Sequence, residues 1–220
     1  VLLSEMLPAS GRNFQLAVQL ALSGQGELLD RLVAKANLSS PDAEKLCRIS
    51  LAGSFAGAVL MPYDAFLVSA RELRYDLEIL QNRFGVSFEQ VCHRLTTLQR
   101  KGARGVPFFF IRIDNAGNIS KRLSGAGFHF ARFGGTCPRW IIHDAFRAPG
   151  TVHTQQASMP DGSAFLTVAR TVDPILGGHH GRQPRLAVAV GCDMGQARHL
   201  VYGDAMDQKN KQGATDVGVS

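Results

Sequence analysis

The first hundred residues repeat apolar side chains at intervals of three and four, which is the spacing of amphipathic helices. Residues 14–22 carry apolar groups all round and predict a short buried helix, and residues 27–36 predict a second helix. Ser40 is a suitable N-cap, and Pro41 suits the first turn of a third helix that ends before Pro62. A further helical stretch is expected from Pro62.

Residues 77–100 predict two helices joined by a tight turn at Gly85. Ser87 and Gln90 have the spacing of a capping box at the start of the second helix. This arrangement resembles a helix-turn-helix, although a packed helical hairpin that binds no DNA gives the same pattern. In the DNA-binding interpretation the second helix would present four side chains to the groove: Glu89, Gln90, His93 and Arg94.

From Gly105 the pattern changes to one typical of strands. Residues 106–114 and 119–124 predict a hairpin that turns around Asn115 to Asn118. Further strands are predicted at 128–133, on both sides of the turn at 159–162, and at 184–194, with a helix over 195–206.

The sequence therefore predicts an α+β fold, in which a helical region precedes a mostly antiparallel sheet. The expected division is a helical domain over residues 1–103 and a sheet domain over residues 104–220. A length of 220 residues suits one large domain or two small ones. The chain starts at Val1 rather than at a methionine, so we expect it to be a piece of a longer protein.

Composition adds three weaker expectations. The formal net charge of +6 favours anionic partners such as nucleic acid or phosphorylated metabolites. No apolar run reaches the roughly 18 residues that span a bilayer, so we expect a cytoplasmic protein with no membrane partner. The four cysteines contain no C-x-x-C pair and are expected to be free, mostly buried thiols: Cys47, Cys92, Cys137 and Cys192.

The segment FAGAVLMPYDAFL resembles metallopeptidase-like domains that carry an H-E-x-x-H motif on an upstream helix. In the corresponding alignment, Val18 and Leu22 replace the two zinc histidines, Gln19 replaces the glutamate, and Leu51 replaces the acidic ligand. None of these side chains can hold zinc or act as a base. The resemblance thus implies a degenerate, inactive version of that domain.

Three longer stretches resemble the short-chain fatty-acyl transcriptional regulators, which include regulators of propionate and methylcitrate metabolism. They are LRYDLEILQNRFGVSFEQVCHRLTTLQR, ARGVPFFFIRIDNAGNISKR and GFHFARFGGTCPRW. The resemblance implies a C-terminal domain that senses a short-chain acyl-CoA such as propionyl-CoA. It also implies operator DNA as a partner through an N-terminal helix-turn-helix domain that is absent here. A homodimer is expected because paired half-sites mirror two-fold symmetry.

The same resemblance bears on a [4Fe–4S] cluster, whose cysteine ligands in this family would follow residue 220. An iron–sulfur cluster needs several neighbouring thiolates. We therefore expect a cluster only in a longer parent protein and none in this chain.

An acyl-CoA needs basic donors for its phosphates and a small apolar pocket for its acyl group. The sheet half supplies arginines, aromatic rings and a glycine turn whose backbone N–H groups can approach a ligand closely. The candidate ligand residues are Arg112, Lys121, Arg122, Phe128, Phe130, Arg132, Phe133, Gly134, Gly135, Thr136 and Trp140.

Three functions remain in view at this point. The first is a non-enzymatic acyl-CoA sensor, and the second is a DNA-binding or dimerisation module without a small-molecule ligand. The third is a thioesterase-type hydrolase, which is disfavoured because the sequence has no G-x-S-x-G elbow and no complete nucleophile, base and orienting group. We predict no catalytic residues and no metal ligands.

Overall fold

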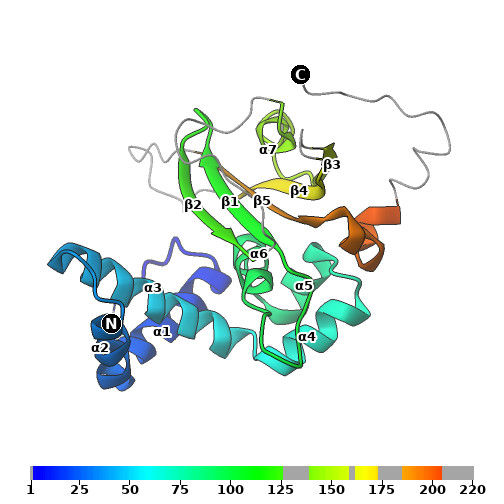
Figure 1. Cartoon of the computed structure of the whole chain (residues 1–220). Coiled ribbons are helices and arrows are strands. Elements are labelled where there is room, and N and C mark those ends of the chain that lie inside the picture. Colours follow the sequence, from blue (N-terminus) through cyan, green and yellow to red (C-terminus); the bar gives the residue numbers. More distant parts are fainter. Residues whose placement is uncertain (1, 126–138, 159–161, 173–184, 205–220) are drawn as a thin grey trace.

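The computed structural model describes residues 2–125, 139–158, 162–172 and 185–204. Six helices come first in the chain (Figure 1). They are α1 (Ala9–Gly24), α2 (Gly26–Lys35), α3 (Pro41–Leu60), α4 (Tyr63–Glu72), α5 (Leu77–Phe84) and α6 (Phe88–Thr96). The elements that follow are β1 (Phe109–Asp114), β2 (Ile119–Ser124), α7 (Ile141–Asp144), β3 (His153–Ser158), β4 (Ala164–Val172), β5 (Leu186–Asp193) and the 3-10 helix η1 (Met194–His199).

Three of the predicted helix ends, at Ser40, Gly85 and Ser87, are confirmed by their capping contacts. The Ser40 hydroxyl accepts a hydrogen bond from the Ala43 N–H at the start of α3. Ser87 and Gln90 form a complete capping box at the start of α6, and Gly85 ends α5 with a φ of 62°. These contacts satisfy N–H and C=O groups that a helix end leaves without partners.

The strands form one sheet in the order β2-β1-β5-β4-β3, and every neighbouring pair is antiparallel. This confirms the predicted hairpin and the predicted antiparallel sheet. The register of β1 and β2 shifts between Arg112 and Ile113, which places a bulge close to the turn of the hairpin.

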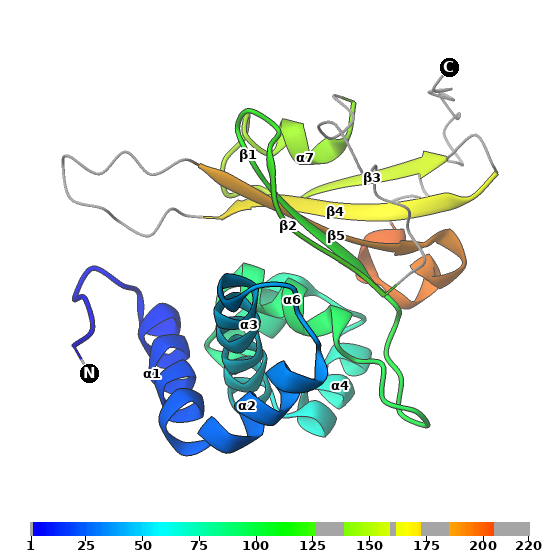
Figure 2. The same cartoon turned by 60° about the vertical axis from the view of Figure 1, so that its left-hand side comes forward.

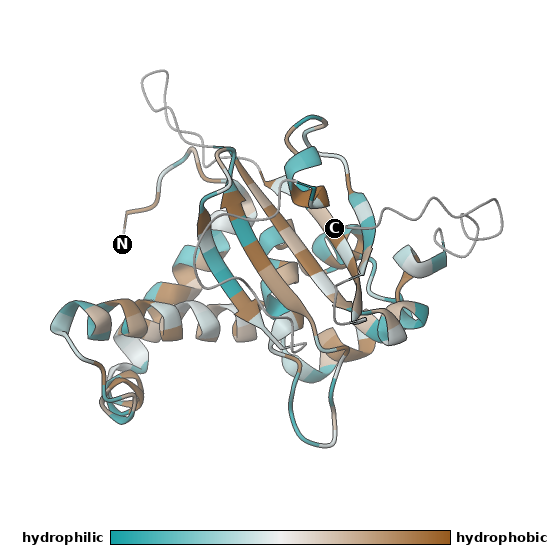
Figure 3. Cartoon of the chain, turned by 45° about the horizontal axis from the view of Figure 1, so that its top comes forward, coloured by the Kyte–Doolittle hydropathy of each residue, from teal (hydrophilic) through white to brown (hydrophobic). Residues whose placement is uncertain are grey.

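The helices α1–α6 lie on one side of the sheet, and the short helix α7 lies on the other side (Figure 2). The main core fills the space between the sheet and α4–α6, and it takes Phe108 and Phe110 from the start of β1 and Val188 and Val190 from β5. It also includes Leu80 of α5. In Figure 3 the strands in the middle of the sheet are mainly hydrophobic, as this two-sided burial requires.

A smaller core lies on the opposite face of the sheet, under α7. Ile111 and Ile113 of β1 pack there with Ile142 and Ala145. The sequence analysis did not predict α7, because four helical residues are too few to show a period. Its role is to cover a face on which β5 contributes only small side chains.

Helices α1, α2 and α3 form a separate layer that packs through small residues. Ala17 and Ala21 of α1 and Ala52 and Ala56 of α3 are buried, whereas larger apolar side chains of the same helices face outward. The exposed ones are Leu16, Leu20, Leu28, Leu32, Leu46, Ile49 and Val59.

Parts of the prediction differ from the structure or lie beyond it. The short helix predicted over residues 14–22 extends over Ala9–Gly24, and it is not buried on all sides, since only Ala17 and Ala21 are buried in it. The helix expected over 195–206 is present only in part, as the 3-10 helix η1 followed by a helical turn at residues 201–204, and the Asp193 carboxylate accepts from the Gly195 N–H at the start of η1. The helical run breaks at Leu200, which takes an extended conformation and inserts into the main core. The strand predicted at 128–133 and most of the turn at 159–162 lie outside the described residues.

The division predicted at residue 103 falls in the connection between α6 and β1. The main core takes side chains from both sides of that position, from Met61 to Leu200. The two-domain division remains a prediction.

Candidate ligand site on the sheet

The face of the sheet beneath α7 is lined by small residues at its centre. Along β5 the side chains alternate, so that Val188, Val190 and Cys192 enter the main core while Ala187 and Ala189 face α7. Gly191 continues the α7 side of this alternation. Because these residues fill little space, larger groups from neighbouring elements can lie over the strand.

Three aromatic rings form a cluster here, and the central one, Phe109, lies against Gly191. The Phe109 ring lies 6.0 Å from the Trp140 ring and 6.1 Å from the Phe165 ring, between centroids. A Cβ atom on Gly191 would come within 2.3 Å of Cζ of Phe109, so glycine is needed for this ring to occupy its place. The buried Thr167 hydroxyl accepts a hydrogen bond from the Trp140 indole at 3.4 Å.

The side chain of Gln155 on β3 fixes the backbone around Trp140. Its amide oxygen accepts from the Ile141 N–H at 2.9 Å, and its amide nitrogen donates to the Arg139 carbonyl at 3.1 Å. Gln155 therefore fixes the backbone on both sides of Trp140, and Thr167 fixes its ring. This aromatic group, Phe109, Trp140 and Phe165, forms an apolar wall on the α7 face of the sheet.

The predicted basic residues are divided between the two faces of the sheet. Arg112 points toward the helices, where it donates to Glu89 of α6 at 2.8 Å and to the Ser120 hydroxyl at 2.9 Å. Lys121 pairs with Arg112 across the hairpin and lies 6.0 Å from the Phe110 ring centroid, on the same face. Arg122 pairs with Ile111, which places it on the α7 face with Trp140.

Burial shapes the protonation of the group around Glu89. It lowers the pKa of Lys121, an effect that the nearby Glu89 carboxylate opposes. Burial also lowers the pKa of His93 to about 4, and the positive charges of Lys121 and Arg94 act in the same direction. With Glu89 already paired to Arg112, this group is better explained as an internal ion-pair network than as a phosphate site.

The structure thus brings together only part of the candidate site. Trp140 and Arg122 share the α7 face, whereas Arg112 and Lys121 are directed to the other side. Seven of the predicted residues lie outside the described residues: Phe128, Phe130, Arg132, Phe133, Gly134, Gly135 and Thr136.

Sequence reasoning missed Phe109, Phe165 and Thr167 as members of this wall. Phe109 lies in a run of three phenylalanines, and strand alternation separates it from Phe108 and Phe110. A signal was available in β5, where an A-x-A-x-G pattern beside large residues indicates a strand face on which something else must pack.

The helix-turn-helix interpretation of residues 77–100 predicted two helices with a turn and a set of side chains that contact DNA. The two helices and their turn are confirmed, but the side chains expected to contact DNA are used inside the protein. Arg94 is buried and donates to the Met61 carbonyl at 3.0 Å and to the Thr97 hydroxyl at 3.1 Å. Glu89 is paired with Arg112, and His93 packs edge-on against Phe110. These contacts favour the packed helical hairpin.

The described cysteines do not form a metal site. Cys47, Cys92 and Cys192 are free thiols, and burial raises the pKa of Cys92 well above its usual value and that of Cys192 to about 12. Cys137 lies outside the described residues. Among the residues that the structure does describe, no three His, Cys, Asp or Glu side chains come close enough to hold a metal ion. The three described thiols are therefore not arranged as the ligands of an iron–sulfur cluster.

In the described segments no single helix is long and apolar enough to cross a bilayer. The bent pair α3 and α4 reaches the necessary length and apolar composition only when the two helices are taken together.

Comparison with protein families identifies the chain. Residues 97–220 match the family described as "Short-chain fatty acyl coenzyme A regulator, C-terminal". The chain belongs to this family. Residues 1–96 match the "IrrE N-terminal-like domain", a peptidase-type family, which confirms the resemblance to metallopeptidase-like domains.

Individual relatives of this chain are regulators by name. The chain is 51% identical over 191 residues to the HTH-type transcriptional regulator PrpR of Mycobacterium tuberculosis, covering 87% of this chain and 39% of PrpR. It is 47% identical over 207 residues to the propionyl-CoA carboxylase regulator of Cereibacter sphaeroides, covering 94% and 45%. The chain thus spans about two fifths of the length of these curated relatives.

A solved structure supports the same relationship. A Mycobacterium tuberculosis transcriptional regulator superimposes with a TM-score of 0.87 at 48% identity, and the match covers 92% of this chain and 61% of that one. The fold described above is therefore the fold of this regulator family.

The residues predicted to replace the zinc ligands of the peptidase-like region are packed apolar side chains. Val18, Leu22 and Leu51 stand at the predicted ligand positions, and all three pack around the small buried cluster of Ala21, Leu29 and Ala52. In this member of the family, side chains at those positions contribute to the packing of α1, α2 and α3.

Proposed function

We propose that this chain is the ligand-sensing part of a transcriptional regulator, and that it binds a short-chain acyl-CoA of the propionyl-CoA type. The observation that carries the proposal is the match of residues 97–220 to the C-terminal region of the short-chain fatty acyl coenzyme A regulators. In the proposed mechanism the ligand shifts the equilibrium between two arrangements, and a helix-turn-helix domain outside this chain binds operator DNA in only one of them. The protein acts without catalysis.

The geometry of the α7 face supports a place for the acyl group. Phe109, Trp140 and Phe165 provide an apolar wall over the small residues of β5. Arg122 lies on the same face and is a candidate for a ligand phosphate. The predicted residues from Phe128 to Thr136 remain candidates for the rest of the site, since they connect β2 with the backbone that holds Trp140.

The DNA-binding alternative has less support, because Glu89, His93 and Arg94 are engaged inside the protein. A hydrolase also has less support, since the named relatives are regulators. We propose that a [4Fe–4S] cluster, if the parent protein carries one, is held by cysteines that follow residue 220, because the described thiols do not gather.

Calorimetric titration with a series from acetyl-CoA to hexanoyl-CoA tests the proposal directly. We expect saturable binding of at least one member, with differences of about 1 kcal/mol per methylene. Free CoA and the matching free carboxylic acids separate the contributions of the two ends of the ligand. Well-folded protein that binds none of the esters would overturn the proposal.

Two arginine variants refine the same experiment. Arg122→Ala and Arg132→Ala should weaken binding of CoA esters more than binding of free carboxylic acids, because a guanidinium contacts phosphate through charge-assisted hydrogen bonds. Arg147→Ala is a matched control, since Arg147 is an exposed arginine paired only with its helix neighbour Asp144. Equal losses in all three variants would indicate a general charge effect in place of specific contacts.

A further inference from the structure

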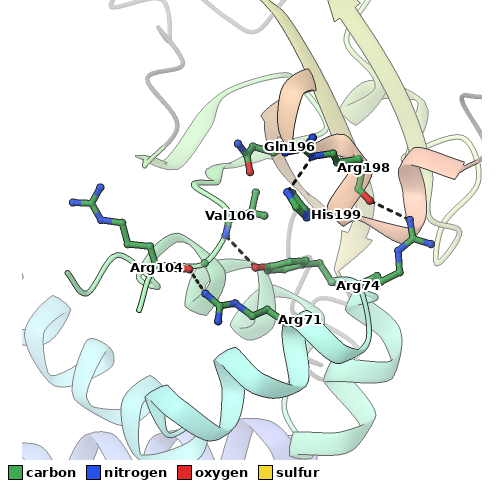
Figure 4. A pocket seen from close by; sticks show the side chains of 9 residues that line it. Arg71, Arg74, Arg104, Val106, Gln196, Arg198 and His199 are labelled. Carbon is green, nitrogen blue, oxygen red and sulfur yellow. Dashed lines mark hydrogen bonds between the residues drawn. The ribbon is translucent and has the colours of Figure 1, made fainter. Parts of the chain in front are cut away.

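A pocket of about 450 Å³ lies where the end of α4, the segment before β1 and the helix η1 meet (Figure 4). Four arginines line it, two from the peptidase-like region and two from the sheet region. They are Arg71, Arg74, Arg104 and Arg198, and His199 lies beside them. The buried Tyr75 and Val106 also contribute to the lining.

One of the four arginines has a structural task. Arg74 donates to both carboxylate oxygens of Asp204 and to the Leu200 carbonyl, and more weakly to the Arg198 carbonyl at 3.4 Å. These bonds fasten η1 and the residues after it to the end of α4. The charge of Arg74 is balanced by Asp204, so Arg74 is not counted as a ligand-binding group.

The charges of the other three arginines are not neutralised by any described carboxylate. Arg71 donates one nitrogen to the Arg104 carbonyl at 2.7 Å, and Arg198 donates Nε to the His199 ring at 3.4 Å. Within the described parts of the chain, no carboxylate forms an ion pair with Arg71, Arg104 or Arg198. The pocket therefore concentrates positive charge at a concave surface.

The lining of the pocket adds a neutral donor. The Tyr75 hydroxyl accepts a hydrogen bond from the Val106 N–H at 3.1 Å. Among the described residues it makes no hydrogen bond as a donor, so its proton remains for a ligand oxygen. A buried hydroxyl fixed by a backbone N–H and lying among arginines is an arrangement that suits a tetrahedral oxyanion.

We propose that this pocket binds the phosphate group of a small phosphorylated ligand. Arg71 and Arg198 supply forked guanidinium donors from opposite sides, and Tyr75 supplies the hydroxyl. Arg71 belongs to residues 1–96 and Arg198 to residues 97–220, so the bound phosphate contacts both family regions. Binding there ties the end of α4 to η1 and stabilises one arrangement of the two regions.

Two sources of the phosphate share this chemistry, a free phosphate or pyrophosphate ion and the nucleotide end of a CoA ester. The second source rests on the proposed function, whereas the affinity of the pocket for a free anion does not. The experiment therefore uses pyrophosphate, adenosine 3′,5′-bisphosphate and propionyl-CoA as separate probes.

The test is calorimetric titration of the 220-residue chain at low ionic strength with each probe. The variants are Arg71→Gln, Arg198→Gln and the double variant, and Arg147→Gln removes one positive charge on the α7 side as a control. We expect saturable pyrophosphate binding that added salt weakens, a loss of about tenfold or more in the double variant, and little change in Arg147→Gln. Unfolding midpoints of all variants show that the pocket residues act on binding and not on folding.

The probes separate the outcomes. If the double variant weakens pyrophosphate and propionyl-CoA alike, the pocket receives the nucleotide end of the ester. If it weakens pyrophosphate alone, the pocket binds a free anion and the acyl-CoA site stands apart. The proposal is overturned if pyrophosphate and the bisphosphate do not bind, or if they bind the double variant as tightly as the wild type. The same variants are tested for binding to duplex DNA. If they lose DNA binding while the wild-type chain binds no anion, the pocket contacts the DNA backbone and the proposal is overturned.

Discussion

Arg74 and Asp204 are 130 residues apart in the sequence and meet through two hydrogen bonds of 2.5 and 2.7 Å. Arg74 and the next residue, Tyr75, both have positive φ angles, 49° and 59°, which non-glycine residues seldom adopt. The turn after α4 is thus held in an uncommon conformation by its partners. Tyr75 binds the segment before β1, and Arg74 binds the segment after β5.

Substitution of Asp204 should change how the stability of the protein depends on pH. The hydrogen bond from Arg74 lowers the pKa of Asp204, so the contact stabilises the folded state at neutral pH and is lost as the pH falls through that lowered pKa. Asp204→Asn should lower the urea midpoint at neutral pH slightly and flatten its decline toward about pH 3. Urea titrations at both pH values measure this, and parallel curves for the two proteins would contradict it.

A second prediction concerns the close approach of Phe109 to Gly191. In Gly191→Ala the new methyl group would meet the Phe109 ring at 2.3 Å and the Leu166 carbonyl oxygen at 2.5 Å. Overpacking of this kind costs about 1–3 kcal/mol, and the backbone contact leaves little room for relief. Chemical denaturation measures the loss.

The matched control for this substitution is Gly57→Ala, within α3, where a Cβ atom meets nothing within 4 Å. There the better helix propensity of alanine should stabilise the protein by up to about 1 kcal/mol. Equal effects at the two glycines would show that the ring contact does not control the packing.

The buried imidazole of His93 gives a third prediction. Its pKa is lowered to about 4, whereas in an unfolded chain it is about 6.5. Between these values the unfolded state binds a proton that the folded state does not, so the free energy of unfolding falls as the pH falls. At pH 5 the loss from this residue is about 2 kcal/mol.

His93→Gln should remove the contribution of this residue to the pH dependence of the free energy of unfolding and leave the other contributions unchanged. Urea unfolding at neutral pH and at about pH 5 measures it, and proton NMR of the His93 ring gives its titration directly. His143→Gln on α7 is the control. A His93 ring that titrates near its ordinary pKa would refute the explanation.

The helical half was predictable because its signals are local. Ser40, the Ser87–Gln90 pair and Gly85 set helix ends within a few residues of themselves, and each makes the contact expected of it. The continuous helix predicted over 195–206 is interrupted because the insertion of Leu200 into the main core overrides the local helical pattern. Such a tertiary contact leaves no trace in periodicity.

The candidate site was harder to predict, because it depends on which face of the sheet each strand residue occupies. Arg112 and Arg122 are both basic strand residues, yet the register places the first beside Glu89 and the second beside Ile111. A shift of one residue in register would exchange the two faces. The arginines of the junction pocket come from segments over a hundred residues apart, so only the folded chain brings Arg71 and Arg198 together.

A fourth prediction uses Trp140, the single tryptophan of the chain. If the acyl group binds against the aromatic wall, propionyl-CoA should change the intrinsic emission of Trp140, and Trp140→Ala should weaken binding by about tenfold. Trp140→Phe keeps an aromatic ring but loses the hydrogen bond to Thr167, and should retain most of the affinity. An unchanged emission together with full affinity in Trp140→Ala would move the acyl site away from this face.

The last prediction concerns the outward leucines of α1, α2 and α3. Leu20 and Leu46 are 63% and 69% exposed, although the alanines of the same helices are buried. Apolar patches of this kind mark contact surfaces, and we propose that a second copy of the chain covers this one. The wild-type chain should sediment as a dimer at micromolar concentration.

The double variant Leu20→Lys/Leu46→Lys should be monomeric. Its unfolding midpoint should be close to that of a monomeric wild-type chain, because neither side chain belongs to a core. Ile79→Lys on α5 is the control, since Ile79 is 47% exposed but lies on a different helix layer. Sedimentation velocity distinguishes the three proteins. A wild-type monomer, or a dimer that survives both lysines, would show that this surface does not join two copies, and would remove the structural support for a homodimer through α1–α3.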